Sequence, residues 1–150
     1  MSTDVNFMAE AMAEARAAEA RGEVPIGAVI AHSGRIIARA GNRTRELNDP
    51  TAHAEMLVIR NACSATSSER LIGADLYVTL EPCAMCAAAI SFARLRRLYF
   101  AASDPKGGAV VSGGRFFAQP TCHHAPEVYD GIGASAASSM LQAFFAKKRA

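Results

Sequence analysis

The sequence predicts an α/β protein in which helices pack against a layered β-sheet. Helical and extended patterns alternate along the chain, and an amphipathic helical pattern lies at each end. With 150 residues, 51% of them hydrophobic, the chain can build one well-buried core but not two ordinary domains. We therefore expect a single domain over residues 1–150.

The first elements are expected to be a helix and a β-hairpin. Apolar side chains recur at helical spacing over residues 3–21, and Gly22 is expected to end that helix. An apolar, β-branched run follows at residues 26–32. A Ser-Gly turn then leads into a second strand over residues 35–40.

A loop and a second helix are expected next. Residues 41–50 are polar and contain glycine and proline, which favours a loop. Thr51 is expected to cap a helix that extends to about residue 62, with His53 in its first turn.

Two strands and a third helix complete the alternation. Residues 75–80 and 97–102 are expected to be strands, the first of them buried. Between them, Pro82 at a first helical position is expected to start a helix over residues 83–93. The start of this helix and the start of the previous one should therefore converge.

The last third of the chain is less regular. Residues 103–133 have little periodicity and several glycines and prolines, so we expect a functional loop whose tip covers a pocket. Helical spacing returns at residues 137–145, before the basic run Lys147, Lys148 and Arg149. This pattern predicts an amphipathic helix with a basic tail.

Composition and charge narrow the classes of function. No run of about eighteen uncharged apolar residues exists, and the N-terminus lacks the pattern of a signal peptide. We expect a soluble, cytoplasmic protein without a membrane partner. Acidic side chains outnumber basic ones in residues 1–93, whereas basic ones predominate in residues 94–150. The excess of basic side chains in this third favours nucleic acid as a partner, within a chain whose net charge is only +2.

One histidine, one carboxylate and two thiols form the candidate chemical site. His53 and Glu55 lie in a His-x-Glu motif, and Cys83 and Cys86 lie in a Pro-Cys-x-x-Cys motif. Zinc prefers nitrogen and sulfur ligands, and catalytic zinc typically has three protein ligands and one open position. We expect His53, Cys83 and Cys86 to hold zinc and Glu55 to move protons.

This pair of motifs matches the signature of the zinc nucleobase deaminases. In those enzymes a zinc-bound hydroxide attacks a ring carbon that carries an amino group. The chain resembles the cytidine deaminase-like superfamily, and within it the bacterial tRNA-specific adenosine deaminases. Beyond the zinc motifs, the resemblance includes Val24-Pro-Ile-Gly-Ala-Val, Gly41-Asn-Arg, Asn48-Asp-Pro-Thr, Leu76-Tyr-Val-Thr-Leu and Ser103-Asp-Pro-Lys-Gly-Gly.

The resemblance implies a three-layer α/β/α fold with a central mixed sheet, a homodimer, and one zinc ion per chain. It also implies hydrolytic conversion of adenosine to inosine at the wobble position of a tRNA anticodon, with the anticodon stem-loop as partner. Residue by residue, it implies that Asn42 hydrogen-bonds the target base and that Asp104 and Lys106 contact neighbouring nucleotides. The basic tail of Lys147, Lys148 and Arg149 then offers candidate contacts to the RNA backbone.

Three alternatives remain open from the sequence. The same zinc motifs occur in deaminases of a free base or nucleoside, such as guanine, cytosine or cytidine, which would need no basic surface. A zinc-bearing RNA-binding subunit without chemistry could retain the fold. A closed structural zinc site would recruit further ligands from Cys122, His123 and His124, and it would leave Glu55 without a role.

Overall fold

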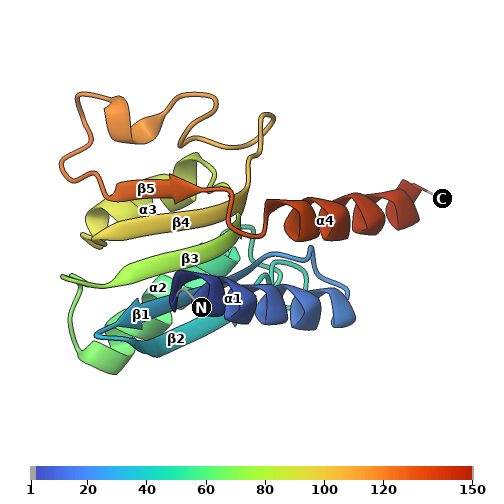
Figure 1. The fold of residues 1–150 in the computed structure, drawn as a ribbon, viewed down its shortest axis with the longest axis horizontal. Helices are drawn as coiled ribbons and strands as arrows, with labels where there is room; N and C mark the ends of the chain where they lie inside the picture. The colour runs from blue at the N-terminus through green and yellow to red at the C-terminus, as the bar shows by residue number, and fades with distance from the viewer. Residues whose placement is uncertain (1–2, 150) are drawn as a thin grey trace.

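A mixed five-stranded β-sheet lies at the centre of the computed structural model, which describes residues 3–149 (Figure 1). In spatial order the strands are β2 (Arg35–Gly41), β1 (Gly27–His32), β3 (Asp75–Leu80), β4 (Arg97–Ala102) and β5 (Glu127–Asp130). Strand β1 is antiparallel to β2 and β3, whereas β3, β4 and β5 are parallel. This arrangement confirms the predicted mixed sheet.

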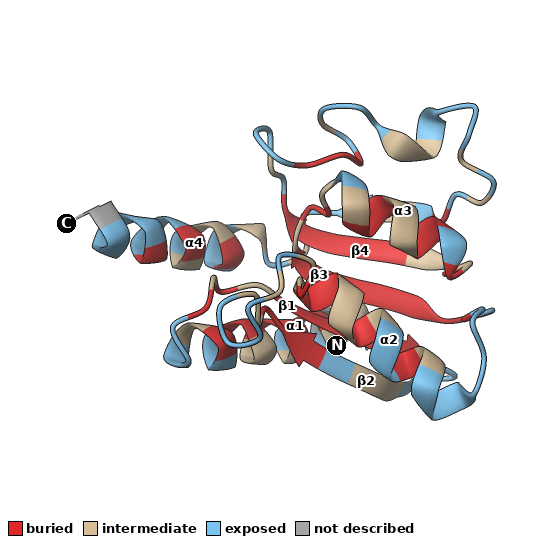
Figure 2. Cartoon of the chain, turned by 180° about the vertical axis from the view of Figure 1, so that it is seen from behind, coloured by how far each residue is buried: buried red, intermediate tan, exposed pale blue. Residues whose placement is uncertain are grey.

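Helices cover both faces of the sheet. Helices α1 (Thr3–Ala20) and α4 (Ala134–Arg149) lie on one face. Helices α2 (Ala54–Thr66) and α3 (Ala84–Phe92) lie side by side on the other face (Figure 2). The predicted three-layer α/β/α architecture is therefore confirmed.

Alternation along the strands divides the buried core into two parts. Successive side chains of a strand point to opposite faces, so neighbouring residues serve different helices. On the face of α2 and α3, the strands contribute aliphatic side chains such as Ile30, Leu76 and Leu98. On the face of α1, Tyr77 and Tyr99 stack with ring centroids 4.3 Å apart.

Helix α1 approaches the sheet closely at a glycine. A Cβ atom at Gly27 would lie 2.1 Å from the carbonyl oxygen of Ala11, which is well inside van der Waals contact. Glycine is therefore required at the start of β1 if α1 is to keep this position. No helix within residues 3–149 is both long enough and apolar enough to cross a membrane.

Helices α2 and α3 begin later than the sequence analysis predicts. Thr51 does not cap α2, because its hydroxyl donates a hydrogen bond to Asp49 at 2.7 Å. Pro82 lies outside α3, which starts at Ala84. His53 and Cys83 instead occupy the positions immediately before the helices, with extended backbone conformations.

The segment of residues 103–133 contains structure that the sequence pattern did not predict. It includes the short 3₁₀ helix η1 (Phe116–Ala118) and the edge strand β5. The expectation that the tip of this segment, around Cys122 and His124, covers the pocket at the helix starts is wrong. Cys122 contacts Ser91, and the ring of His124 hydrogen-bonds the carbonyl oxygen of Leu95 at 2.7 Å, so the tip packs beside the C-terminal end of α3.

Candidate metal centre and active site

The candidate metal centre lies where α2 and α3 begin. His53 precedes α2, Cys83 precedes α3, and Cys86 is buried in the first turn of α3. Because His53 and Cys83 have extended backbones, their side chains meet beyond the ends of the helices rather than along their sides. The two predicted motifs are therefore brought together although 30 positions separate His53 from Cys83.

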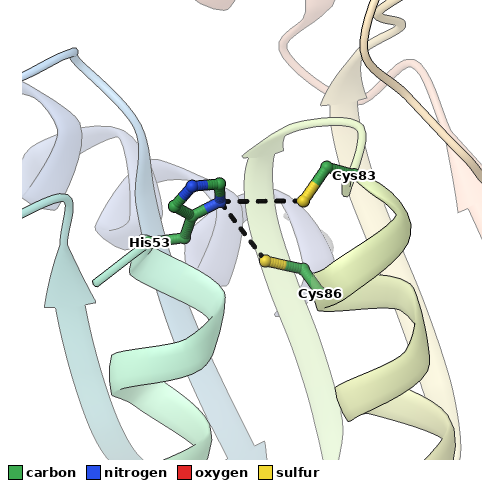
Figure 3. A group of neighbouring side chains, drawn as sticks. All are labelled: His53, Cys83 and Cys86. Carbon is green, nitrogen blue, oxygen red and sulfur yellow. Dashed lines mark hydrogen bonds between the residues drawn. The ribbon is translucent and has the colours of Figure 1, made fainter. Parts of the chain in front are cut away.

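The three potential ligand atoms are spaced as a zinc ion requires. The Nδ1 atom of His53 lies 3.7 Å from Cys83 Sγ and 3.5 Å from Cys86 Sγ, and it points toward both sulfurs (Figure 3). Tetrahedral zinc with ordinary Zn–N and Zn–S bond lengths would separate nitrogen and sulfur by about 3.6 Å. The donor set and its spacing therefore fit one zinc ion.

The ligand side chains also influence one another's ionisation. Hydrogen bonds that the Cys83 sulfur accepts from Cys86 and His53 lower the pKa of the Cys83 thiol to about 4. The interaction with Cys83 in turn raises the pKa of His53, and hydrogen bonding with Cys83 together with burial raises that of Cys86. A thiolate at Cys83 is the form that binds a metal, so the centre is prepared for a cation.

Glu55 lies beside this centre and is not one of its three ligands. Its side chain is 4% exposed, and it interacts with His53, Cys83 and Cys86. Burial raises the pKa of Glu55 to about 7. A carboxyl group with this pKa can both accept and donate a proton near neutral pH, as a general acid and base requires.

Asn42 is fixed next to the same helix start. Its side-chain oxygen accepts a hydrogen bond of 2.8 Å from the backbone N–H of Ala54, the first residue of α2. Because the oxygen has this partner, the side chain is oriented so that its Nδ2 group is the one remaining to contact a ligand.

The other predicted contact residues border a neighbouring cavity. Asp104 Oδ1 accepts hydrogen bonds from the backbone N–H groups of Lys106 and Gly107, at 3.2 and 3.0 Å, so this carboxylate stabilises the turn that carries Lys106. A cavity of about 470 Å³ lies between this turn and α4, where Leu141 and the 43%-exposed ring of Phe145 line it.

The basic tail lies at the end of α4. Lys147 and Lys148 are exposed, and the Lys148 ammonium lies over the Phe144 ring at 5.5 Å from its centroid. The side chain of Arg149 lies outside the described part of the structure.

The closed structural zinc site is not formed. Among the residues that the structure describes, the group able to hold a metal consists of His53, Cys83 and Cys86. Cys122 and His124 are held near the far end of α3, and all four cysteines are free thiols. The three-residue donor set leaves one position of a tetrahedral zinc ion for water or substrate.

Two buried glutamates beside the site were missed by the sequence analysis. Glu23 accepts hydrogen bonds from the backbone N–H groups of Arg45 and Glu46, in the loop that follows Asn42. Glu81 does the same for the loop after β4. A charged residue at the end of an otherwise apolar buried strand was the available signal for Glu81, since such a carboxylate needs partners.

Comparisons with known proteins agree with this arrangement. Residues 1–102 match the family model of the cytidine and deoxycytidylate deaminase zinc-binding region. The tRNA-specific adenosine deaminase of Agrobacterium fabrum is 66% identical over 149 residues, which cover 99% of this chain and 98% of that protein.

Solved structures are similar as well. One comes from biochemical and structural studies of A-to-I editing by tRNA:A34 deaminases at the wobble position of transfer RNA. It is 69% identical, with a TM-score of 0.89, and the match covers 91% of this chain and 99% of the other. The guanine deaminase of Bacillus subtilis is 32% identical, with a TM-score of 0.66, over 94% of this chain and 92% of the other.

The α/β/α fold, the open histidine–cysteine centre and the adjacent buried carboxylate define a zinc-dependent hydrolytic deaminase, and the chain belongs to the cytidine and deoxycytidylate deaminase family. Within that family it belongs with the tRNA-specific adenosine deaminases.

Proposed function

We propose that this enzyme converts adenosine to inosine at the wobble position of a tRNA anticodon. The observation that carries the proposal is the convergence of His53, Cys83 and Cys86 with the buried carboxylate of Glu55 at one point. The identities of 66% and 69% to proteins described as tRNA adenosine deaminases support this choice of substrate.

The chemistry follows from the ligand set and from Glu55. Zinc, when bound, lowers the pKa of water from about 15.7 toward about 7, which makes a nucleophile available at neutral pH. Glu55 accepts a proton from the attacking water and passes it to the ring nitrogen of adenine. The same carboxyl group then assists the departure of ammonia, because its pKa of about 7 suits both directions of transfer.

Asn42 orients the base. Its oxygen is occupied by the N–H of Ala54, so its Nδ2 group donates to an acceptor nitrogen of the purine. This role places the base beside the start of α2, next to His53.

The RNA chain on either side of the target base follows the surface between the Lys106 turn and α4. The cavity there is lined by the exposed ring of Phe145, which offers a face for stacking, and by Lys106, which offers a positive charge. In this proposal Asp104 contributes by shaping the turn, and Lys147, Lys148 and Arg149 contact phosphates.

The decisive experiment is an assay of the zinc-loaded protein on an arginine tRNA transcript with a wobble adenosine. Free adenosine, guanine and cytidine are tested in parallel, and both inosine and ammonia are measured. We expect inosine in the tRNA at the wobble position and no ammonia from the small molecules. A transcript with guanosine at that position is the matched control.

Deamination of a free base is the second candidate. The guanine deaminase of Bacillus subtilis has a similar fold, and its name gives a free base as the substrate. Ammonia from guanine or cytidine, with no inosine in the tRNA, would select this candidate. The roles proposed for zinc and Glu55 would then apply to a different base.

We also propose that the enzyme is a homodimer. Phe92 at the end of α3 is 73% exposed, and Val111 in the segment after β4 is also exposed. Aromatic residues are enriched in interfaces between protein chains, so Phe92 is the residue that supports this proposal. Sedimentation velocity measures the mass of the particle directly, and a monomer at micromolar concentration would contradict this proposal.

A further inference from the structure

Glu81 is the most heavily hydrogen-bonded carboxylate near the site. It lies between the end of β3 and Pro82, and it is 2% exposed. One oxygen accepts the backbone N–H of Asp104 at 2.9 Å and the hydroxyl of Ser112 at 3.0 Å. The other accepts three backbone N–H groups at 3.0 Å, from Val110, Val111 and Ser112.

The loop of residues 104–112 therefore wraps around a single carboxylate. A Cβ atom at Gly108 would lie 2.4 Å from Cδ of Glu81, so the loop backbone is in direct contact with that group. The backbone N–H of Ala109 also donates to the carbonyl oxygen of Pro82 at 2.9 Å. This loop is thus attached to the residues that immediately precede Cys83.

The same loop carries Lys106. The Asp104 side chain forms the turn at Lys106 and Gly107, and the backbone N–H of Asp104 is itself held by Glu81. Lys106 is exposed at the cavity beside α4. The position of the Lys106 backbone relative to the metal centre thus depends on a carboxylate two residues before Cys83.

We propose that Glu81 is a positioning residue for substrate RNA. Its carboxylate holds the loop of residues 104–112 against the chain directly before Cys83, and it thereby places Lys106 beside the target nucleotide. The inference rests on the proposed tRNA substrate for the role of Lys106. The set of hydrogen bonds from the 104–112 loop to Glu81, which we call the Glu81 clamp, is independent of that substrate. Glu81 touches neither the metal ligand atoms nor the base in this role.

The first test is the Glu81→Gln variant, studied by amide hydrogen exchange. Both carboxylate oxygens of Glu81 accept hydrogen bonds. In either orientation of the glutamine amide, its NH₂ group would replace one of these acceptors and would face backbone N–H or hydroxyl donors. We expect faster exchange at Val110, Val111 and Ser112, with one zinc ion per chain retained by elemental analysis. Unchanged exchange at these amides would overturn the clamp, whether or not the protein edits tRNA.

The second test asks whether the effect reaches the substrate through Lys106. We expect Glu81→Gln to raise KM for the tRNA about tenfold with kcat nearly unchanged, because a binding group is displaced while the chemistry is kept. In a Lys106→Ala background the same substitution should add little, since the group that it displaces is already absent. Additive effects, or loss of zinc, would overturn the route through Lys106.

Glu23→Gln is the matched control. Glu23 is 1% exposed and also holds backbone N–H groups, but those of Arg45 and Glu46 in the other loop. We expect faster exchange at Arg45 and Glu46 only, and an effect on KM that is additive with Lys106→Ala. If Glu23→Gln gave the same non-additive pattern, the effect would be a general loss of rigidity and the proposal would be wrong.

Ser112→Ala provides a milder variant in case Glu81→Gln does not fold. It removes one hydrogen bond to Glu81 and keeps the carboxylate, so we expect smaller changes in exchange and KM of the same kind. If the unaltered enzyme forms no inosine, the proposed substrate fails, and the exchange measurements still decide whether Glu81 organises the loop.

Discussion

His53, Cys83 and Cys86 show how individual residues acquire their chemical character from their neighbours. The thiol of Cys83 has its pKa lowered to about 4 because it is hydrogen-bonded by Cys86 and His53. The carboxyl group of Glu55, only two positions after His53, has its pKa raised to about 7 because it is buried. The same site therefore contains a thiolate that can bind a metal and a carboxyl group that can exchange protons near neutral pH.

We expect Glu55→Ala to retain zinc and to lose deamination. The ligand atoms belong to other residues, whereas removal of a general acid–base group lowers kcat by about 10²- to 10⁴-fold. Zinc content by elemental analysis and single-turnover inosine formation measure the two properties separately. A variant that retains its zinc and its full rate would remove Glu55 from the mechanism.

Alkylation of the metal-free protein tests the ionisation of Cys83. With a pKa of about 4, Cys83 is already a thiolate above about pH 5, so its rate with iodoacetamide should be nearly constant from pH 6 to 8. Burial raises the pKa of Cys63, so its rate should rise about tenfold per pH unit over the same range. Peptide mapping by mass spectrometry gives both rates in one sample.

Bound zinc provides the control for this measurement. Zinc-loaded protein should be protected at Cys83 but not at Cys63, because Cys83 belongs to the ligand group and Cys63 does not. A tenfold rise per pH unit at Cys83 would show that its thiol is not perturbed.

At the scale of elements, the starts of two helices and the side of a third define the functional surface. Helices α2 and α3 bring the ligands together at their N-termini. Helix α4 carries the buried ring of Phe144, and next to it the exposed ring of Phe145 lines the cavity beside Lys106. Its last turn carries Lys147 and Lys148 into solvent, where they can interact with phosphates but contribute little to packing.

Substitution of the α4 basic tail should weaken tRNA binding without changing the chemistry. We expect Lys147→Ala, Lys148→Ala and Arg149→Ala together to raise KM for tRNA and to reduce the slope of log K against log salt concentration by about two to three. Binding isotherms at several salt concentrations give this slope. Glutamine at the same three positions is the control for side-chain length, and an unchanged slope would show that the tail does not contact RNA.

For the molecule as a whole, the metal centre joins parts of the chain that are distant in sequence. His53 belongs to the segment after the β1–β2 hairpin, whereas Cys83 and Cys86 follow the central strand β3. A ligand that binds only the folded arrangement stabilises it by mass action. Zinc should therefore contribute to stability as well as to reactivity.

Removal of zinc with a chelator should lower Tm by about 5 to 10 °C, as expected for the loss of about 2.7 kcal/mol from a chain of this size at a hundredfold excess of zinc over Kd. Calorimetry with and without the chelator measures the change, and added zinc should reverse it. The His53→Ala variant should show little response to the chelator. A similar response in that variant would show that the chelator acts at another place.

Sequence by itself determined the ligand types, the fold class and much of the sheet. Strands β3 and β4 have the predicted bounds, because their continuous apolar runs are a local property of buried strands. His53, Cys83 and Cys86 were identified because a zinc site depends on residue types at fixed spacing. The roles of Glu55, Asn42, Lys106 and the basic tail stay predictions.

Tertiary structure alone decided how these parts are oriented. Strand β5 escaped prediction because it is a short, largely exposed edge strand with no clear periodicity of its own. The helix starts at Ala54 and Ala84, the orientation of the Asn42 amide, and the Glu81 clamp all depend on hydrogen bonds or ligand contacts across 12 to 33 positions. A local pattern reports the preference of a segment for helix or strand, but the partner of a buried polar group is fixed only when distant segments pack together.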